Sequence, residues 1–115
     1  MNIQIFGKAK CQQTKKAQRY FKERRVPFHY VDILKKGLSP GEYASVKKAV
    51  GGASLIDANS RAYKESFIEY LDAQEMIEEE KLQENLELYI TPIVRRGKEA
   101  TLGYAPEVWE NWLAK

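Results

Sequence analysis

The sequence contains only one cysteine and one histidine among its 115 residues. A single cysteine excludes an internal disulfide, and because small secreted domains usually carry several, we expect a protein of the reducing cytoplasm. Cys11 and His29 together cannot supply the ligands of an ordinary zinc site. No metal is therefore expected, and His29 is interpreted as an ordinary strand residue. A phosphate-binding glycine loop is also missing, because Gly51 and Gly52 are better explained as a helix stop.

Long apolar runs are missing as well. No segment approaches the roughly 18 consecutive apolar residues that a membrane-spanning helix requires. Residues 1–6 alternate polar and apolar side chains and lack the basic, apolar and small-residue order of a signal peptide. We therefore expect no membrane partner.

The net charge of +3 conceals two halves of opposite charge. Residues 1–50 contain 12 Lys and Arg against 3 acidic residues, and residues 51–115 contain 7 against 13. A basic half can indicate nucleic-acid binding. Here, however, no nucleic-acid motif accompanies the charge, and four basic residues interleave with the core positions of one predicted helix: Lys15, Lys16, Arg19 and Lys22. We interpret them as a solvated helix face, expect no nucleic-acid partner, and expect anions to be attracted near Cys11.

The first third of the chain has the pattern of a β-α-β unit. A short apolar strand over 3–6 is followed by a helical pattern from Gln12, whose apolar stripe at i, i+3, i+4 spacing is formed by Ala17, Tyr20 and Phe21. Pro27 ends that helix, and the β-rich run 28–34 predicts a second strand. Two strands joined by a helix are expected to be parallel.

The rest of the chain predicts helices first and then a second half of the sheet. Ser39, Pro40 and Glu42 form a capping box for a helix whose buried face is predicted at Tyr43, Val46, Ala49 and Val50. Residues 54–88 have a helical pattern in several pieces. A strand over 91–94, a turn over 95–98, a strand over 100–103 and a helix from Pro106 follow. The sequence therefore predicts one α/β domain, 1–115, with a thioredoxin-like β-α-β … β-β-α mixed sheet. Its core is expected over 1–37 and 89–115, with an all-helical insertion over 38–88.

Cys11 is the candidate nucleophile, because it lies between the first strand and the first helix. Unpaired backbone N–H groups and the helix dipole favour negative charge there, and Lys8 and Lys10 add to that field. These effects favour thiolate, which is the reactive form. The alternative is an inert cysteine that serves only as a small buried side chain. Thr14 can hydrogen-bond the thiolate or cap the helix, but it cannot resolve a mixed disulfide. Any cycle is therefore monothiol and needs an external thiol.

Thr91 and Pro92 form the third part of the predicted site. In a thioredoxin-like layout, a proline begins the strand beside the reactive cysteine, and its peptide bond is commonly cis. The preceding backbone is then free to pair with an extended peptide or with glutathione. The order of Cys11, Thr91-Pro92 and a closing β-β-α pattern carries this interpretation.

Five stretches resemble the arsenate reductase (ArsC) and Spx family: 5–17, 26–33, 38–42, 91–94 and 103–109. The resemblance covers essentially the whole chain. It implies a thioredoxin fold with inserted helices, a nucleophile matching Cys11, and reduction by glutathione with glutaredoxin or thioredoxin. It also implies arginines that bind an oxyanion. In this sequence Thr91 stands where the family has the arginine before the proline. Tyr104 or a neighbour stands in place of a second family arginine. The third family arginine aligns near Asp57, and Arg61 lies four residues further along the chain.

We therefore expect a glutathione- or thiol-dependent oxidoreductase with no bound cofactor and with glutathione as a possible co-substrate. Arsenate, which needs bidentate arginine contacts, is an incidental substrate at most. The alternatives are an Spx-like module that binds RNA polymerase and a non-catalytic thioredoxin-fold protein. The candidate site consists of the nucleophile and eight residues predicted to bind substrate: Cys11, then Lys8, Lys10, Gln12, Gln13, Thr14, Arg61, Thr91 and Pro92.

Overall fold

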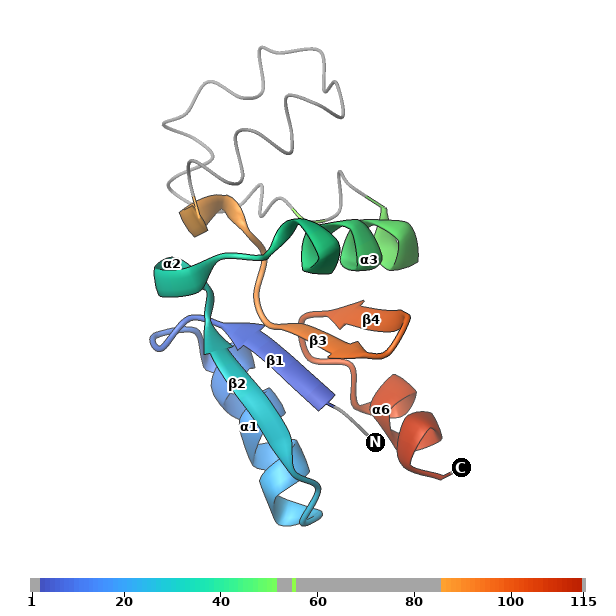
Figure 1. Ribbon diagram of the computed structural model, residues 1–115. Coiled ribbons are helices and arrows are strands. Elements are labelled where there is room, and N and C mark those ends of the chain that lie inside the picture. Colours follow the sequence, from blue (N-terminus) through green and yellow to red (C-terminus); the bar gives the residue numbers. More distant parts are fainter. Residues whose placement is uncertain (1–2, 52–54, 56–85, 115) are drawn as a thin grey trace.

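The computed structural model describes residues 3–51, 55 and 86–114 (Figure 1). Its elements are, in chain order, β1 (Ile3–Gly7), α1 (Gln12–Glu23), β2 (Phe28–Asp32), α2 (Ile33–Lys36), α3 (Pro40–Val50), the 3-10 helix η3 (Leu86–Leu88), β3 (Ile93–Arg96), β4 (Glu99–Leu102) and α6 (Pro106–Leu113). Among these residues no helix is long and apolar enough to cross a bilayer.

The four strands form one mixed sheet in the order β2-β1-β3-β4. β1 and β2 are parallel, whereas β3 is antiparallel to both β1 and β4. Ile5 at the centre of β1 pairs with Tyr30 on one side and Val94 on the other. This arrangement confirms the predicted thioredoxin-like β-α-β … β-β-α sheet. Most of the predicted helical insertion lies outside the described residues, and its boundaries stay a prediction.

Alternation along the strands divides the core into two layers. Ile3 and Ile5 point to the face that α1 and α6 cover, whereas Phe6 points to the face that α3 covers (Figure 1). The first layer contains Ile3, Ile5, Ala17, Tyr20, Phe21, Val94, Trp109 and Trp112. The second contains Phe6, Val31, Ile33, Leu38, Tyr43, Val46, Leu55, Leu88, Tyr89 and Ile93. The predicted stripe of α1 is therefore confirmed.

The predicted capping box of α3 is also confirmed. Ser39 Oγ accepts from the Glu42 N–H at 3.2 Å, and Glu42 Oε1 accepts from the Ser39 N–H at 2.9 Å. Gly51, at φ 88°, ends the helix as expected. The buried side chains of α3 are Tyr43 and Val46, and Val50 packs against them partly buried. The prediction for Ala49 was wrong: it is exposed, because at 100° per residue it lies about 90° from the centre of that stripe.

The predicted boundaries of all four strands differ from the observed ones, by one residue in β1, at both ends of β3 and β4, and at the end of β2. The second strand ends at Asp32 rather than at residue 34, because Asp32 Oδ1 accepts from the Leu34 N–H at 3.0 Å and caps α2. Arg95 and Arg96, predicted in a turn, belong to β3. The turn is confined to Gly97 and Lys98, and Gly97 has φ 58°. A two-residue hairpin loop of this kind lets the strands pair up to its edge.

Candidate active site

Cys11 occupies the N-cap position of α1, beyond the carboxyl end of β1. Its backbone is extended, at φ −82° and ψ 119°, and its side chain does not cap the helix. Its own N–H donates to the Lys8 carbonyl at 3.0 Å, and its carbonyl accepts from the Lys15 N–H at 3.1 Å. The loop from β1 to α1 is thereby closed tightly, and the half-buried thiol lies at the amino end of the helix.

The surroundings of Cys11 favour its ionised form. Burial raises the pKa of the thiol, but hydrogen bonds outweigh this effect, so that the pKa of Cys11 lies below its ordinary value. These bonds come from the side chains of Thr14 and Thr91 and from the backbone of Thr14 and Gln13. The helix start therefore supplies donors to a thiolate, as expected of a reactive cysteine.

Thr14, whose side chain hydrogen-bonds the thiol, is buried at 1% exposure. Its Oγ1 also accepts from the Lys8 N–H at 3.4 Å. A β-carbon on Gly7 would collide with the Thr14 side chain and would lie only 2.7 Å from its Oγ1. Only a glycine at the end of β1 lets the strand approach the first turn of α1 this closely.

Thr91 and Pro92 lie beside Cys11 across 80 residues of sequence. The Thr91–Pro92 peptide is cis, the geometry usual for a thioredoxin-like layout. In its neutral form the Cys11 thiol donates to the Thr91 carbonyl oxygen at an Sγ–O distance of 3.6 Å, a bond that is lost on ionisation. Both residues are buried, and the Pro92 carbonyl accepts from the Gly103 N–H at 2.8 Å, which fixes this segment to the end of β4.

Lys8 is placed differently from what the sequence indicated. Its ammonium group does not stand open for an anion, because Nζ donates to the Glu87 carbonyl at 2.8 Å and to the Tyr89 carbonyl at 2.9 Å. These carbonyls belong to the segment that leads into Thr91. Lys8 therefore connects the loop that carries Cys11 to the segment that carries the cis-proline.

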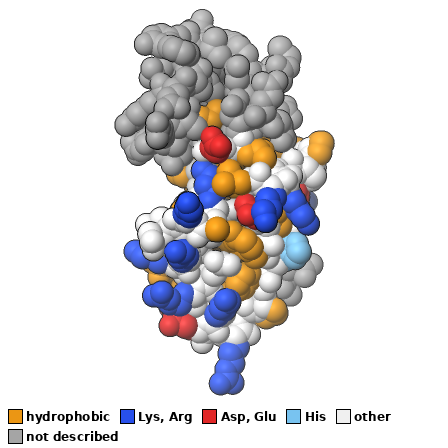
Figure 2. Space-filling view, turned by 90° about the vertical axis from the view of Figure 1, so that its left-hand side faces the viewer, with side chains coloured by type: hydrophobic (Ala, Val, Ile, Leu, Met, Phe, Trp, Pro, Cys, Tyr) orange, Lys and Arg blue, Asp and Glu red, His pale blue; other side chains and the backbone are white. Residues whose placement is uncertain are grey.

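The thiol opens into a cavity of about 460 Å³ lined by Lys8, Ala9, Lys10, Cys11, Asp32 and Leu34. Leu34 is 44% exposed, an unusual position for a large apolar side chain. The cavity therefore offers a substrate an apolar contact as well as charged groups. Figure 2 shows the face that includes the β2 edge of the sheet, where apolar side chains reach the surface between lysines and arginines.

Three residues of β2 and α2 near the thiol were not predicted from the sequence: Tyr30, Asp32 and Leu34. Burial first, and then the charges of Asp32 and Cys11, raise the pKa of Tyr30. Its phenol is therefore held in the neutral form. The predicted parallel pairing of the two strands could have identified these three residues. Gly7 is in register with Asp32, so the carboxyl ends of both strands meet at this edge of the sheet.

The other residues predicted in the site are Lys10, Gln12, Gln13 and Arg61. Gln12 and Gln13 lie exposed in the first turn of α1. Of these two residues only Gln13 hydrogen-bonds the thiol, through its backbone N–H. Lys10 lines the cavity. Arg61 lies outside the described residues. Within the described part of the chain, no group of three or more His, Cys, Asp or Glu side chains is placed to hold a metal ion.

The family model described as "ArsC family" matches residues 6–112. The chain belongs to the ArsC family. A comparison with curated proteins gave no significant match.

Solved structures of the ArsC family share its fold at low identity. An arsenate reductase from Vibrio cholerae superposes with a TM-score of 0.85 at 18% identity, covering 96% of this chain and 97% of that one. An ArsC-related protein from Bacteroides fragilis gives 0.84 at 19%, covering 96% and 98%. One from Brucella melitensis gives 0.70 at 19%, covering 100% and 97%. At this identity the likeness establishes the fold alone, and the chemistry is argued from the site.

Proposed function

We propose that this ArsC-family chain is a monothiol oxidoreductase of the cytoplasm that exchanges disulfides through Cys11. The Cys11 thiolate attacks one sulfur of a disulfide, forming a mixed disulfide while the other sulfur leaves as a thiolate and takes a proton from water. A second thiol then attacks the mixed disulfide, releases the Cys11 thiolate and leaves as part of a new disulfide. That thiol comes from glutathione, glutaredoxin or thioredoxin.

One observation carries this proposal: a single half-buried thiol with a lowered pKa, held at a helix start and opening into a cavity. Thiolate is the attacking species in exchange. The chain has no second cysteine to resolve the adduct, so an external thiol must complete the cycle.

The site favours a disulfide over an oxyanion as substrate. A doubly charged oxyanion is best held by bidentate guanidinium groups, and among the described residues that line the cavity there is none. Lys8 is already bonded to two carbonyl oxygens. The exposed Leu34 suits a carbon-bearing thiol such as glutathione or a protein cysteine.

Incubation with oxidised glutathione followed by intact-protein mass spectrometry tests the proposal. The wild type should gain one glutathionyl group, which glutaredoxin or a small thiol then removes, and Cys11→Ser should gain none. A wild type that stays unmodified while its Cys11 alkylates no faster than free cysteine would overturn the proposal. That result would favour a non-catalytic thioredoxin-fold protein. If wild type and Cys11→Ser also capture RNA polymerase subunits equally from lysate, it would favour the Spx-like module instead.

A further inference from the structure

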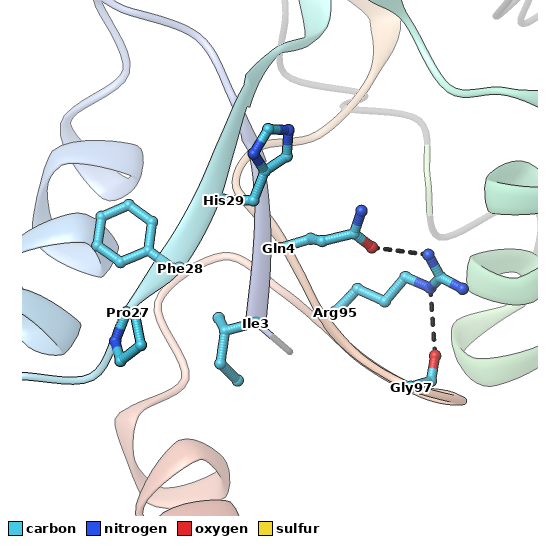
Figure 3. Close-up of a pocket in the computed structure, with 7 residues that line it drawn as sticks. All are labelled: Ile3, Gln4, Pro27, Phe28, His29, Arg95 and Gly97. Carbon is cyan, nitrogen blue, oxygen red and sulfur yellow. Dashed lines mark hydrogen bonds between the residues drawn. The ribbon is translucent and has the colours of Figure 1, made fainter. Parts of the chain in front are cut away.

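A row of polar side chains crosses the sheet at the end opposite to Cys11. Gln4 on β1 is in register with His29 on β2 and with Arg95 on β3. Since side chains of paired residues project to the same face, all three stand on one face of three adjacent strands. Figure 3 shows them projecting from their strands, with Gln4 and Arg95 meeting between β1 and β3.

This row begins where the cover of α3 ends. Two residues along the same strands, and on the same face, are Val31, Phe6 and Ile93, which are also in register. They are buried in the layer that includes Tyr43 and Val46 of α3. The sheet face thus changes from apolar to polar on three strands at once, at the boundary of the helix.

The polar row lies in a cavity of about 510 Å³, whose lining includes Ile3, Gln4, Phe28, His29, Arg95 and Gly97 (Figure 3). A second cavity of about 320 Å³ shares Gln4 and His29 and continues towards Lys36 and Glu42. The two cavities adjoin at Gln4 and His29 and are together called the groove here; each has a size in the range that small organic ligands occupy. The groove contains no residue of the Cys11 cavity.

Arg95 is held in a fixed position by neutral groups. Its Nη1 donates to Gln4 Oε1 at 2.7 Å, and its Nε donates to the Gly97 carbonyl at 3.2 Å. Among the described residues it has no carboxylate partner within salt-bridge distance. The adjacent Arg96, in contrast, is paired with Glu99 at 3.6 Å. A guanidinium that is oriented but not neutralised retains N–H groups for a ligand.

We infer that this groove is a binding site for a small organic anion, whose carboxylate or phosphate group is held by Arg95 and Gln4. The charged groups that line the groove are mostly cationic, because Arg95 and Lys36 carry positive charge. The one carboxylate that lines it, Glu42, accepts the Ser39 N–H in the capping box of α3. Pro27, which is exposed and lines the same cavity as Arg95, offers apolar contact for the carbon part of the ligand. The site is independent of the proposed chemistry at Cys11.

Nuclear magnetic resonance titration of the full chain tests the inference. The probes are citrate and phenyl phosphate, with phenol as the neutral control, and sodium chloride holds the ionic strength constant. The amide signals of Gln4, His29, Arg95 and Gly97 should shift and saturate with at least one anion and not with phenol. Comparing citrate with phenyl phosphate tells whether the carboxylate or the phosphate is preferred.

Matched variants decide the role of Arg95. Arg95→Gln should weaken binding about tenfold or more, the loss expected for charge-assisted hydrogen bonds. Arg96→Gln makes the same change of charge one residue away and should leave the affinity within about twofold. Gln4→Ala keeps the charge of Arg95 but removes its anchor and should also weaken binding. Amide shifts that fail to saturate would overturn the inference. Equal losses of affinity in Arg95→Gln and Arg96→Gln would also overturn it. So would unchanged affinity in an Arg95→Gln protein whose amide spectrum is otherwise intact.

Discussion

The ammonium group of Lys8 donates a hydrogen bond to the carbonyl oxygen of Tyr89, at 2.9 Å and across 81 residues of sequence. A second bond, to the Glu87 carbonyl, has a length of 2.8 Å. Tyr89 lies two residues before Thr91, whose carbonyl accepts from the Cys11 thiol. Lys8 therefore positions the cis-proline segment against the loop that carries Cys11.

Replacing Lys8 with methionine keeps the length of the side chain and removes both bonds. Because hydrogen bonds from a charged donor contribute more than neutral ones, we expect a loss of about 1–2 kcal/mol in the free energy of unfolding. The rate of mixed-disulfide formation with oxidised glutathione should fall several-fold. Urea denaturation and stopped-flow measurements check these values.

Lys10→Met is the matched control, because Lys10 is exposed and lines the same cavity. It changes the charge near Cys11 equally but breaks none of the hydrogen bonds described above. If Lys8→Met and Lys10→Met slow the reaction equally and neither loses stability, Lys8 acts through its charge alone and the positioning role is wrong.

Thr14→Val tests the hydrogen bond that favours the thiolate. The valine has nearly the same shape, so the change removes a donor from Cys11 and should raise the pKa of the thiol. Alkylation by iodoacetamide at neutral pH should then slow several-fold, and its dependence on pH should move to higher pH. Thr14→Ser retains the hydroxyl and should stay close to the wild type. A Thr14→Val profile that coincides with the wild type would exclude Thr14 as a determinant of reactivity.

The lowered pKa of Cys11 also predicts a dependence of stability on pH. Free cysteine has a pKa of about 8.5, so between the folded pKa and that value the unfolded chain binds more protons than the folded one. Stability due to Cys11 is therefore fully present above about pH 8.5 and is lost as the pH falls through the folded pKa. Urea denaturation of wild type and Cys11→Ser over this range should show the difference in unfolding free energy growing with pH. A difference that is constant, or that shrinks as the pH rises, contradicts the lowered pKa.

Local patterns predicted much of the fold. The stripe of α1 and the capping box of α3 depend on residues three and four apart, and such signals can be read without knowledge of the tertiary contacts. The hairpin was placed incorrectly, because the extent of β3 depends on its pairing with β1 as well as on its own residues. Arg95 shows this: it was expected in the turn but pairs with Gln4, 91 residues earlier.

The site was predicted in outline but not in its contacts. Cys11 and the Thr91–Pro92 pair were found from their order along the chain and the position of a helix start. The partners of Lys8 were not predictable, because a lysine beside a cysteine gives no local sign that its ammonium group will bond to carbonyls near residue 89. Leu34 was assigned to a strand, and only the cap at Asp32 turns it towards the cavity.

Gly7 and Gly41 differ in the space that surrounds an added β-carbon. At Gly7 an added β-carbon would collide with Thr14, a buried side chain that cannot move without disturbing the thiol. Gly7→Ala should therefore destabilise the fold by about 1–3 kcal/mol and lower the reactivity of Cys11. At Gly41, near the start of α3, nothing lies within 4 Å of an added β-carbon. Gly41→Ala should therefore stabilise the fold by about 0.4–1 kcal/mol, because alanine loses less backbone entropy.

Thermal unfolding and iodoacetamide alkylation of both variants, Gly7→Ala and Gly41→Ala, test these expectations. Opposite signs of stability change, with reactivity lost only in Gly7→Ala, would show that the close approach of β1 to α1 holds Cys11 in place. A Gly7→Ala protein as stable and as reactive as the wild type would show that it does not.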